Sequence, residues 1–344
     1  MEQNQTILDG IDPEIKDRLV SRRDAIRKGA TASAMLTWGL SLGSVPVALA
    51  AMSKEAFGQA PSDILDALQF ALILEHLENE FYKAVLGTSA VAAQNTAFVP
   101  VRTAIGALPQ GAAITATLQQ IQKHEQAHVD FLRAAITGAG GTPPTITAND
   151  FDFTGGNGAG NGPFARATQE PQFLLLAAQA FEDTGVRAYK GQAGRFLIAS
   201  NQAADVALEA ALRIHSVEAR HAAKIRNIRR DLNTGETVIR YSGTVRGGGA
   251  AAAGASMITN APAGAVAALN LIYENEQNTS HVVNNGSADV TINVATGVTG
   301  LGAIGTGQAL TDAITEAFDE ALTKAQVIAI VKDFIKDDAA RGLP

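Results

Sequence analysis

Two copies of the motif Glu-x-x-His, at 125–128 and 218–221, constrain this chain most. Residues three apart lie on the same side of a helix, so each motif points a carboxylate and an imidazole at one place. A further glutamate precedes each motif on the apolar face of an earlier predicted helix, Glu75 before the first motif and Glu182 before the second. This order is typical of a four-helix bundle that holds two metal ions through shared carboxylates.

Apolar residues recur at helical spacing in four long segments of the chain. The predicted helices span about 62–86, 112–136, 171–198 and 202–232. The segment between the first two, 88–110, contains two prolines and is predicted to be looser. All four helices carry candidate ligands, so the sequence predicts that the ligands meet in the middle of the bundle.

Six side chains are the candidate metal ligands. They are Glu75, Glu125, His128, Glu182, Glu218 and His221. Four carboxylates balance two divalent ions, whereas unpaired carboxylates on the apolar faces of helices would be costly. The chain has no cysteine, so only oxygen and imidazole nitrogen can bind a metal. Iron and manganese both accept such ligands, and the sequence therefore predicts two ions of Fe or Mn.

The first helix offers two candidate ligands, because Glu75 and Glu78 both face inward, one turn apart. Glu78 could be an additional or alternative ligand, while the tyrosine seven residues after Glu75 favours Glu75. Glu80 is predicted to face solvent. His76 and His124 neighbour candidate ligands in sequence but are predicted to point elsewhere on their helices.

Two tyrosines and one histidine could support the centre. Tyr82 and Tyr189 follow their candidate glutamates at the same spacing, which predicts an internal pseudo-twofold between two helix hairpins. They could donate hydrogen bonds to the bridging carboxylates, or simply pack between helices. His215 lies one turn before the second motif and could contact a ligand, or could be a satisfied polar residue of the core.

The rest of the chain is less regular. Residues 138–166 are rich in Gly, Pro and Asn, and 155–162 are predicted to hold no packed structure. The low-charge region 233–308 is predicted to be a small β-containing insertion. Its strands are predicted at 237–241, 265–273 and 289–295, and its turns at 247–249 and 284–286. A last helix is predicted at 324–336, begun by a capping box of Thr323 and Gln326.

The N-terminal region has the features of an export signal. Residues 21–28 include paired arginines and resemble a twin-arginine signal; the stretch 29–53 carries no charge, and 48–50 fits a cleavage site between small residues. We therefore predict an N-terminal tail at 1–20, a signal peptide at 21–50 and a periplasmic protein. The alternative is a retained inner-membrane anchor facing the periplasm, because the uncharged stretch is just long enough to span a bilayer.

The net charge of −7 argues against a nucleic-acid partner, since general nucleic-acid binders present a basic surface. Contact with a membrane is expected only through the N-terminal segment, if that segment is not cleaved.

Three stretches resemble the ferritin-like superfamily, and more narrowly its desiccation-related branch: 74–82, the two Glu-x-x-His motifs, and 318–324. The resemblance implies an all-α fold built on a ferritin-like four-helix bundle at 60–232, with a long crossover between helices 2 and 3. The β-containing insertion at 233–308 and a C-terminal fifth helix within 309–344 would follow the bundle.

The resemblance also implies a di-iron or di-manganese centre held by the six residues named above. Bacterioferritin-type sites often place an acid directly before each motif glutamate, whereas this chain has His124 and Val217 there. The implied function is redox chemistry with O₂, peroxide or Fe²⁺, as a ferroxidase, a peroxidase or a catalase-like enzyme. The alternatives are a metal-stapled structural, stress or assembly protein without turnover, and an iron-sequestering protein; a homo-oligomer is possible in each case.

Overall fold

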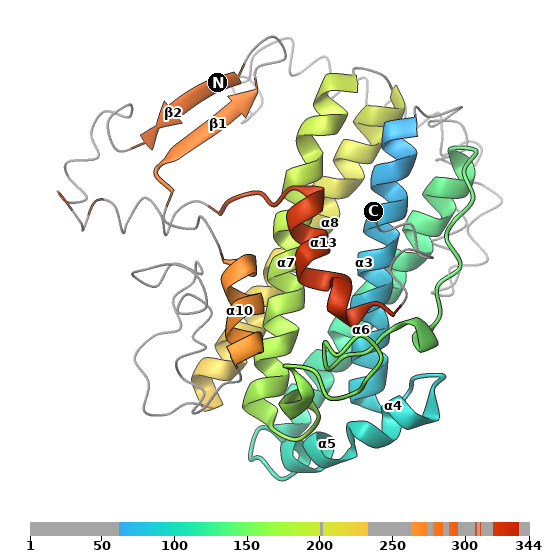
Figure 1. Ribbon diagram of the computed structural model, residues 1–344, viewed down its shortest axis with the longest axis vertical. Coiled ribbons are helices and arrows are strands. Elements are labelled where there is room, and N and C mark those ends of the chain that lie inside the picture. The colour runs from blue at the N-terminus through green and yellow to red at the C-terminus, as the bar shows by residue number, and fades with distance from the viewer. Residues whose placement is uncertain are drawn as a thin grey trace, which may run out of the picture. The chain divides into compact units, whose positions relative to one another are not determined.

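The computed structural model describes the residues that form the bundle and parts of the C-terminal region (Figure 1). These are 62–199, 202–232, 263–273, 278–284, 289–294, 307, 310 and 319–336. The predicted signal segment, the predicted strand at 237–241 and the predicted turn at 247–249 lie outside the described residues. Within the described ranges, no helix combines the length and the apolarity needed to cross a membrane.

Four long helices form the body of the structure (Figure 1). They are α3 (Ser62–Leu86), α6 (Gly111–Gly138), α7 (Pro171–Ala199) and α8 (Gln202–Leu232). The predicted positions of all four are confirmed. The most extensive contacts pair α3 with α6 and α7 with α8, so the bundle consists of two helix hairpins. The looser segment between α3 and α6 contains two short helices, α4 (Ala92–Ala97) and α5 (Val99–Gly106).

A glycine and an arginine cap the C-terminal end of α3. Gly87 adopts a φ of +80°, a conformation that glycine allows without steric cost. The Arg102 guanidinium of α5 donates hydrogen bonds to the carbonyl oxygens of Ala84 and Val85, at 3.0 and 3.1 Å. These carbonyls have no partner inside the helix, so α5 stabilises the C-terminus of α3.

The connector between α6 and α7 is packed, and the prediction that 155–162 holds no packed structure is wrong. The Asp152 carboxylate accepts hydrogen bonds from the backbone N–H groups of Gly158 and Gly160, both at 2.9 Å. Both glycines have positive φ, which a side chain would disfavour. One buried carboxylate thus satisfies several backbone donors of a glycine-rich turn, an arrangement that composition alone does not reveal.

The C-terminal segment packs on this connector. Helix α13 (Lys324–Val331) continues into the 3₁₀ turn η7 (Lys332–Phe334). The capping box is confirmed, since Thr323 N donates to Gln326 Oε1 at 2.9 Å and Gln326 N donates to Thr323 Oγ1 at 3.3 Å. Backbone N–H of Asp152 donates to the carbonyl of Phe334 at 2.8 Å. The fifth helix therefore orders the long crossover.

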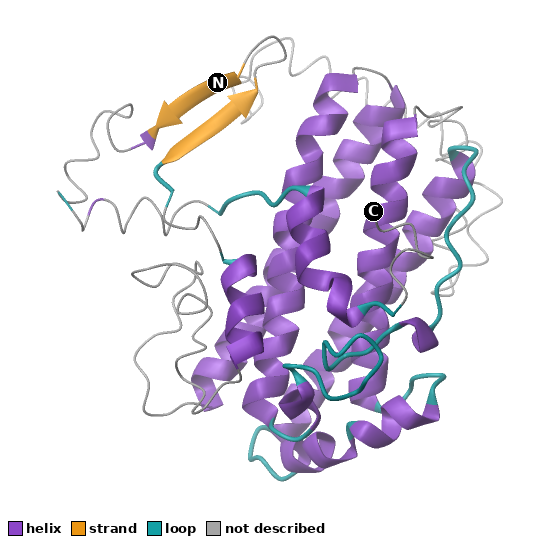
Figure 2. Ribbon diagram, in the orientation of Figure 1, coloured by secondary structure: helices purple, strands orange, loops and turns teal. Residues whose placement is uncertain are grey.

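The predicted insertion is partly helical (Figure 2). The strand predicted at 265–273 is wrong, because these residues lie in helix α10 (Ala263–Ile272) and the turn after it. Its buried residues Ala265, Leu269 and Ile272 recur at spacings of four and three, which is helical; a short apolar run leaves the two choices ambiguous. The strand predicted at 289–295 is confirmed as β2 (Asp289–Asn293), paired antiparallel with β1 (Ser280–Asn284).

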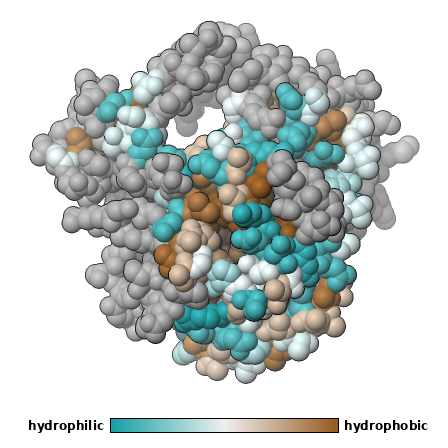
Figure 3. All heavy atoms as spheres, in the orientation of Figure 1, coloured by the Kyte–Doolittle hydropathy of each residue, from teal (hydrophilic) through white to brown (hydrophobic). Residues whose placement is uncertain are grey.

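Two apolar clusters fill the bundle on either side of its middle. One is rich in aromatic rings, with Phe81 making edge-to-face contacts to Phe98, Phe153 and Phe181 at 5.0–6.1 Å. The other is built mainly from aliphatic side chains and alanines, together with Tyr189 and Phe196. On the face shown in Figure 3, hydrophilic and hydrophobic residues are mixed over the described surface. The all-α ferritin-like architecture is confirmed, whereas the boundaries of the predicted domains stay predictions.

Candidate metal centre

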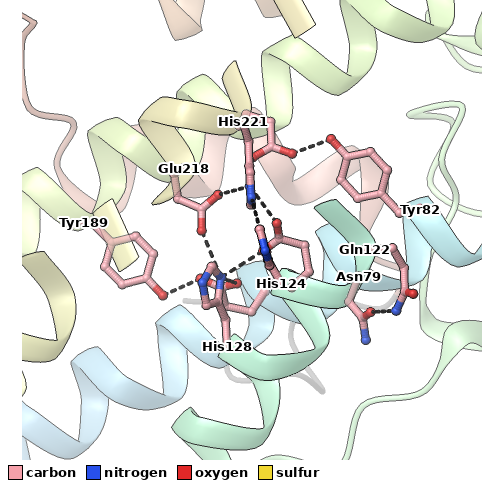
Figure 4. A network of polar contacts seen from close by, with 11 residues as sticks. Asn79, Tyr82, Gln122, His124, His128, Tyr189, Glu218 and His221 are labelled. Atoms are coloured by element: carbon pink, nitrogen blue, oxygen red, sulfur yellow. Dashed lines mark hydrogen bonds and ion pairs between the residues drawn. The ribbon is translucent and has the colours of Figure 1, made fainter. Parts of the chain in front are cut away.

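The six predicted ligands meet between the two apolar clusters (Figure 4). Helix α3 contributes Glu75 and α7 contributes Glu182, while α6 and α8 contribute the two Glu-x-x-His motifs. Taken as whole residues, all six are buried, with at most 9% of their surface exposed. Four helices therefore bring four carboxylates and two imidazoles into the interior of one bundle.

The first candidate position for an ion lies at His128. Its Nδ1 atom is 3.0 Å from a carboxylate oxygen of each of three residues: Glu75 Oε2, Glu125 Oε2 and Glu218 Oε1. These four ligand atoms lie within 4.8 Å of one another, which is close enough to surround one ion.

The second ion position lies at His221. Its Nδ1 atom is 2.9 Å from Glu125 Oε1, 3.1 Å from Glu182 Oε2 and 3.3 Å from Glu218 Oε2. Glu125 and Glu218 thus direct one oxygen to each position, whereas Glu182 serves only this one. Two carboxylates are placed to bridge two ions, and the other two, from α3 and α7, are terminal.

Both tyrosines donate hydrogen bonds to the terminal carboxylates. Tyr189 Oη donates to Glu75 Oε1, and Tyr82 Oη donates to Glu182 Oε1, so each bond crosses between the hairpins. The prediction that the tyrosines donate hydrogen bonds to ligand carboxylates is confirmed, but the carboxylates are the terminal ones and not the bridging ones. Bridging oxygens are already turned toward the two ion positions, while each terminal carboxylate has one outer oxygen left over. Burial raises the pKa of both tyrosines well above its usual range, so both remain O–H donors.

Burial and crowding shift the protonation of the ligands. Burial raises the pKa of Glu75 to about 8 and that of Glu182 well above its usual range. Burial alone would lower the pKa of His221, but the carboxylate of Glu182 and hydrogen bonds to its neighbours outweigh it and raise that pKa to about 12. Hydrogen bonds from the two imidazoles hold the pKa of Glu218 below its usual range, against the effect of burial. Without an ion, protons on the histidines supply the positive charge.

Protons on the two histidines cannot pair with all the carboxylate oxygens that surround them. Each imidazole Nδ1 carries at most one proton but faces three oxygens at 2.9–3.3 Å, so a single N–H cannot be directed at all three. An octahedral ion with ligands at about 2.1 Å keeps neighbouring ligand atoms about 3.0 Å apart, close to the separations found here. A divalent ion at each position would contact every oxygen that the proton leaves unpaired. The residues therefore fit two metal ions.

Comparison with known families agrees with this geometry. Residues 63–231 match the family model described as the ferritin-like domain. These residues form a ferritin-like domain. No curated protein and no solved structure matches the chain. The match spans the four helices that carry the candidate ligands and ends before α10, the β-hairpin and α13.

A fifth carboxyl group adjoins the centre of the ferritin-like domain. Glu78 is 4% exposed, and burial together with the charges of Glu218 and the other glutamates raises its pKa well above its usual range. A Cβ atom built on Gly185 would lie 3.1 Å from Glu78 Oε1, so the glycine makes room for this carboxyl group. Glu78 belongs to neither group of four ligand atoms. The prediction that Glu80 faces solvent is wrong, because it is buried at 8% exposure and pairs with Lys83 at 2.8 Å.

The three other histidines of the four-helix bundle differ in their contacts. The prediction that His124 points away from the ligands is wrong, because its Nδ1 lies 2.9 Å from Nε2 of His221. His215 donates from Nδ1 to the Val186 carbonyl at 3.0 Å, so it is a satisfied core residue rather than a contact of a ligand. His76 is buried, without a hydrogen bond within the described part of the chain, and burial lowers its pKa to about 4.

Proposed function

We propose that the ferritin-like domain binds two ions of iron or manganese and carries out redox chemistry with O₂, peroxide or Fe²⁺. The observation that carries the proposal is the pair of bridging carboxylates, each of which directs one buried oxygen to Nδ1 of His128 and the other to Nδ1 of His221. Two redox metals held this close together supply a two-electron change at one site.

The protein residues have separate tasks in this proposal. Glu125 and Glu218 keep the two ion positions a fixed distance apart, because each carboxylate serves both. The tyrosines hold the outer oxygens of the terminal carboxylates, which leaves the inner oxygens directed at the ions. The two apolar clusters keep bulk water from the centre. Glu78 is placed to keep a proton beside the four ligand carboxylates.

A purely structural use of the metal is a less favoured candidate. The bundle has two apolar clusters of its own, and the protonated histidines already offset the buried carboxylates. The fold therefore has sources of stability that do not need an ion. We propose that a metal-free protein still folds, which thermal unfolding with and without metal would test.

Export is also a proposal, motivated by the paired arginines at 22–23 and the uncharged stretch that follows. A twin-arginine route would allow the centre to be loaded before the folded protein leaves the cytoplasm. Cell fractionation tests it: the native chain should be periplasmic, and the double variant Arg22→Lys, Arg23→Lys should stay in the cytoplasm. Equal distribution of the two proteins would contradict export by this route.

The function itself is tested by metal analysis of protein isolated from its native compartment, followed by assays with O₂ and Fe²⁺ and with peroxide. Two ions per chain with turnover of one of these substrates supports the proposal. Two redox-inert ions would favour a structural role, and many irons per chain in a closed oligomer would favour iron sequestration. Glu209→Gln is a suitable control, because Glu209 is exposed on α8 and, among the described residues, pairs with its neighbour Arg213.

A further inference from the structure

The two ion positions have the same kinds of ligand and share two bridging carboxylates, but they differ in what supports their histidines. The residue directly before the motif glutamate is His124 in α6 and Val217 in α8. His124 reaches across to the histidine of the opposite motif, with its Nδ1 2.9 Å from Nε2 of His221. The planes of the two rings are inclined by only 13° and their centroids are 5.2 Å apart, so the rings meet end to end at these two nitrogens (Figure 4).

This contact determines which nitrogen of His221 carries its proton when a metal is bound. Because Nδ1 faces the carboxylates, it supplies the lone pair for an ion, and Nε2 then bears the proton. That proton is donated to Nδ1 of His124. The Nε2 atom of His124 lies 2.6 Å from the side-chain amide of Gln120, whose oxygen can accept the remaining proton once the two ends of the amide are exchanged. The chain His221–His124–Gln120 therefore holds one tautomer and one ring orientation.

His128 has no such support. Val217 has no polar group in its side chain, and among the described residues no partner reaches Nε2 of His128. His128 is also the more exposed of the two imidazoles, with 11% of its side chain accessible against 5% for His221. Its ring is positioned by carboxylates on one side only.

We infer that His124 is a positioning residue that makes the two ion positions unequal, so that the position at His221 binds a divalent ion more tightly than the position at His128. A hydrogen-bond acceptor behind a ligating histidine fixes its orientation and increases its basicity, and losing such a partner typically weakens metal binding by about 10–100-fold. The inference rests on the proposed two-metal function. It assigns a resident ion to His221 and an exchangeable ion, such as substrate Fe²⁺, to His128.

The test is titration of the metal-free, full-length protein with Mn²⁺, followed by calorimetry and by electron paramagnetic resonance. Native protein should bind two ions in separate steps that differ by about tenfold or more. With one equivalent of Mn²⁺, the spectrum should show isolated ions, and the signal of a coupled pair should appear only with the second equivalent. Neither readout depends on turnover.

Two variants should reduce this asymmetry by different routes, one by weakening the tighter step and the other by strengthening the weaker step. His124→Ala should weaken the tighter step about tenfold or more, so that coupled pairs form before one equivalent is added, and His124→Asn should restore part of the difference by keeping an acceptor. Val217→His should strengthen the weaker step, because it supplies the missing partner to His128. Lys123→Ala, an exposed neighbour on α6, is the matched control and should leave both steps unchanged.

The possible failures are distinguishable. If native protein binds two ions but neither His124→Ala nor Val217→His changes the ratio of the two steps, the inference is wrong and the two-metal centre stands. The same conclusion follows if His124→Ala weakens both steps equally. If native protein binds no Mn²⁺, Fe²⁺ or Co²⁺, the proposed function fails, and the inference fails with it.

Discussion

The hairpin α3–α6 and the hairpin α7–α8 carry the same ligands in different surroundings. Each supplies one terminal glutamate, one Glu-x-x-His motif and one tyrosine that bonds the terminal glutamate of the other hairpin. They differ at two positions next to these residues: Glu78 faces Gly185, and His124 has Val217 as its counterpart. Two equivalent ions require duplicated ligands, whereas nothing requires the supporting residues to match. The duplicated side chains therefore define the candidate centre, and the unmatched residues are where we expect its two halves to differ.

The largest expected effect comes from the two carboxylates that both ion positions share. Glu125→Ala and Glu218→Ala each remove a carboxylate that serves both positions, so each should weaken binding of both ions by more than the roughly 100-fold seen when a supporting residue is lost. Glu75→Ala should remove mainly the ion at His128. Equilibrium dialysis against Mn²⁺ measures the ions retained per chain.

Glu209→Ala serves as the exposed control on α8 and should retain both ions. A chain that loses both ions with Glu75→Ala but only one with Glu125→Ala would invert the assignment of terminal and bridging carboxylates.

The pH dependence of metal-free protein gives the next largest effect. The pKa of Glu75 is raised to about 8 and that of His221 to about 12, and each raised group contributes stability that is lost as pH rises through its folded pKa. Metal-free protein should thus lose this contribution progressively above pH 5. Ion binding requires these groups deprotonated, so the increase in Tm on adding Mn²⁺ should grow between pH 5.5 and 8.

At an ion concentration 100 times the Kd, the stabilisation should be about 2.7 kcal/mol. Thermal unfolding across this pH range measures it. A metal-induced shift in Tm that shrinks as pH rises would contradict the protonation assigned to the empty centre.

The sequence predicts the parts of this structure that depend on periodicity. The four long helices and the six ligands follow from apolar spacing and from two repeats of Glu-x-x-His, because helix geometry fixes which residues share a face. The hydrogen-bonded turn around Asp152 does not follow from composition, since it depends on one buried carboxylate that accepts hydrogen bonds from the N–H groups of Gly158 and Gly160. His124 was missed for a similar reason: its partner lies on another helix. The one available signal was its place directly before a motif glutamate.

A smaller effect is expected from the tyrosines, and it should be equal in both hairpins. Tyr82→Phe and Tyr189→Phe each leave a buried oxygen of a terminal glutamate without its donor. The free energy of unfolding of metal-free protein should fall by about 1–3 kcal/mol in each variant. Urea denaturation monitored by circular dichroism measures both variants under one condition. A large loss in one variant and none in the other would show that the pseudo-twofold does not extend to these bonds.

The smallest effect concerns the pair that most clearly separates the hairpins, Glu78 and Gly185. Gly185→Ala should gain about 0.5–1 kcal/mol from helix propensity, but its new Cβ would lie 3.1 Å from a Glu78 oxygen and force that buried carboxyl group to move. The two contributions oppose one another, so the single variant should be nearly neutral. In a Glu78→Ala background the crowding is absent, and the same substitution should stabilise the protein by the full amount.

A double-mutant cycle measures this difference as a coupling free energy of about 0.5–1 kcal/mol. The cycle is best run on metal-free protein, so that a change in ion affinity does not enter the result. If Gly185→Ala were equally stabilising in both backgrounds, the glycine would not be making room for Glu78. The two hairpins would then differ functionally only at the support of their histidines.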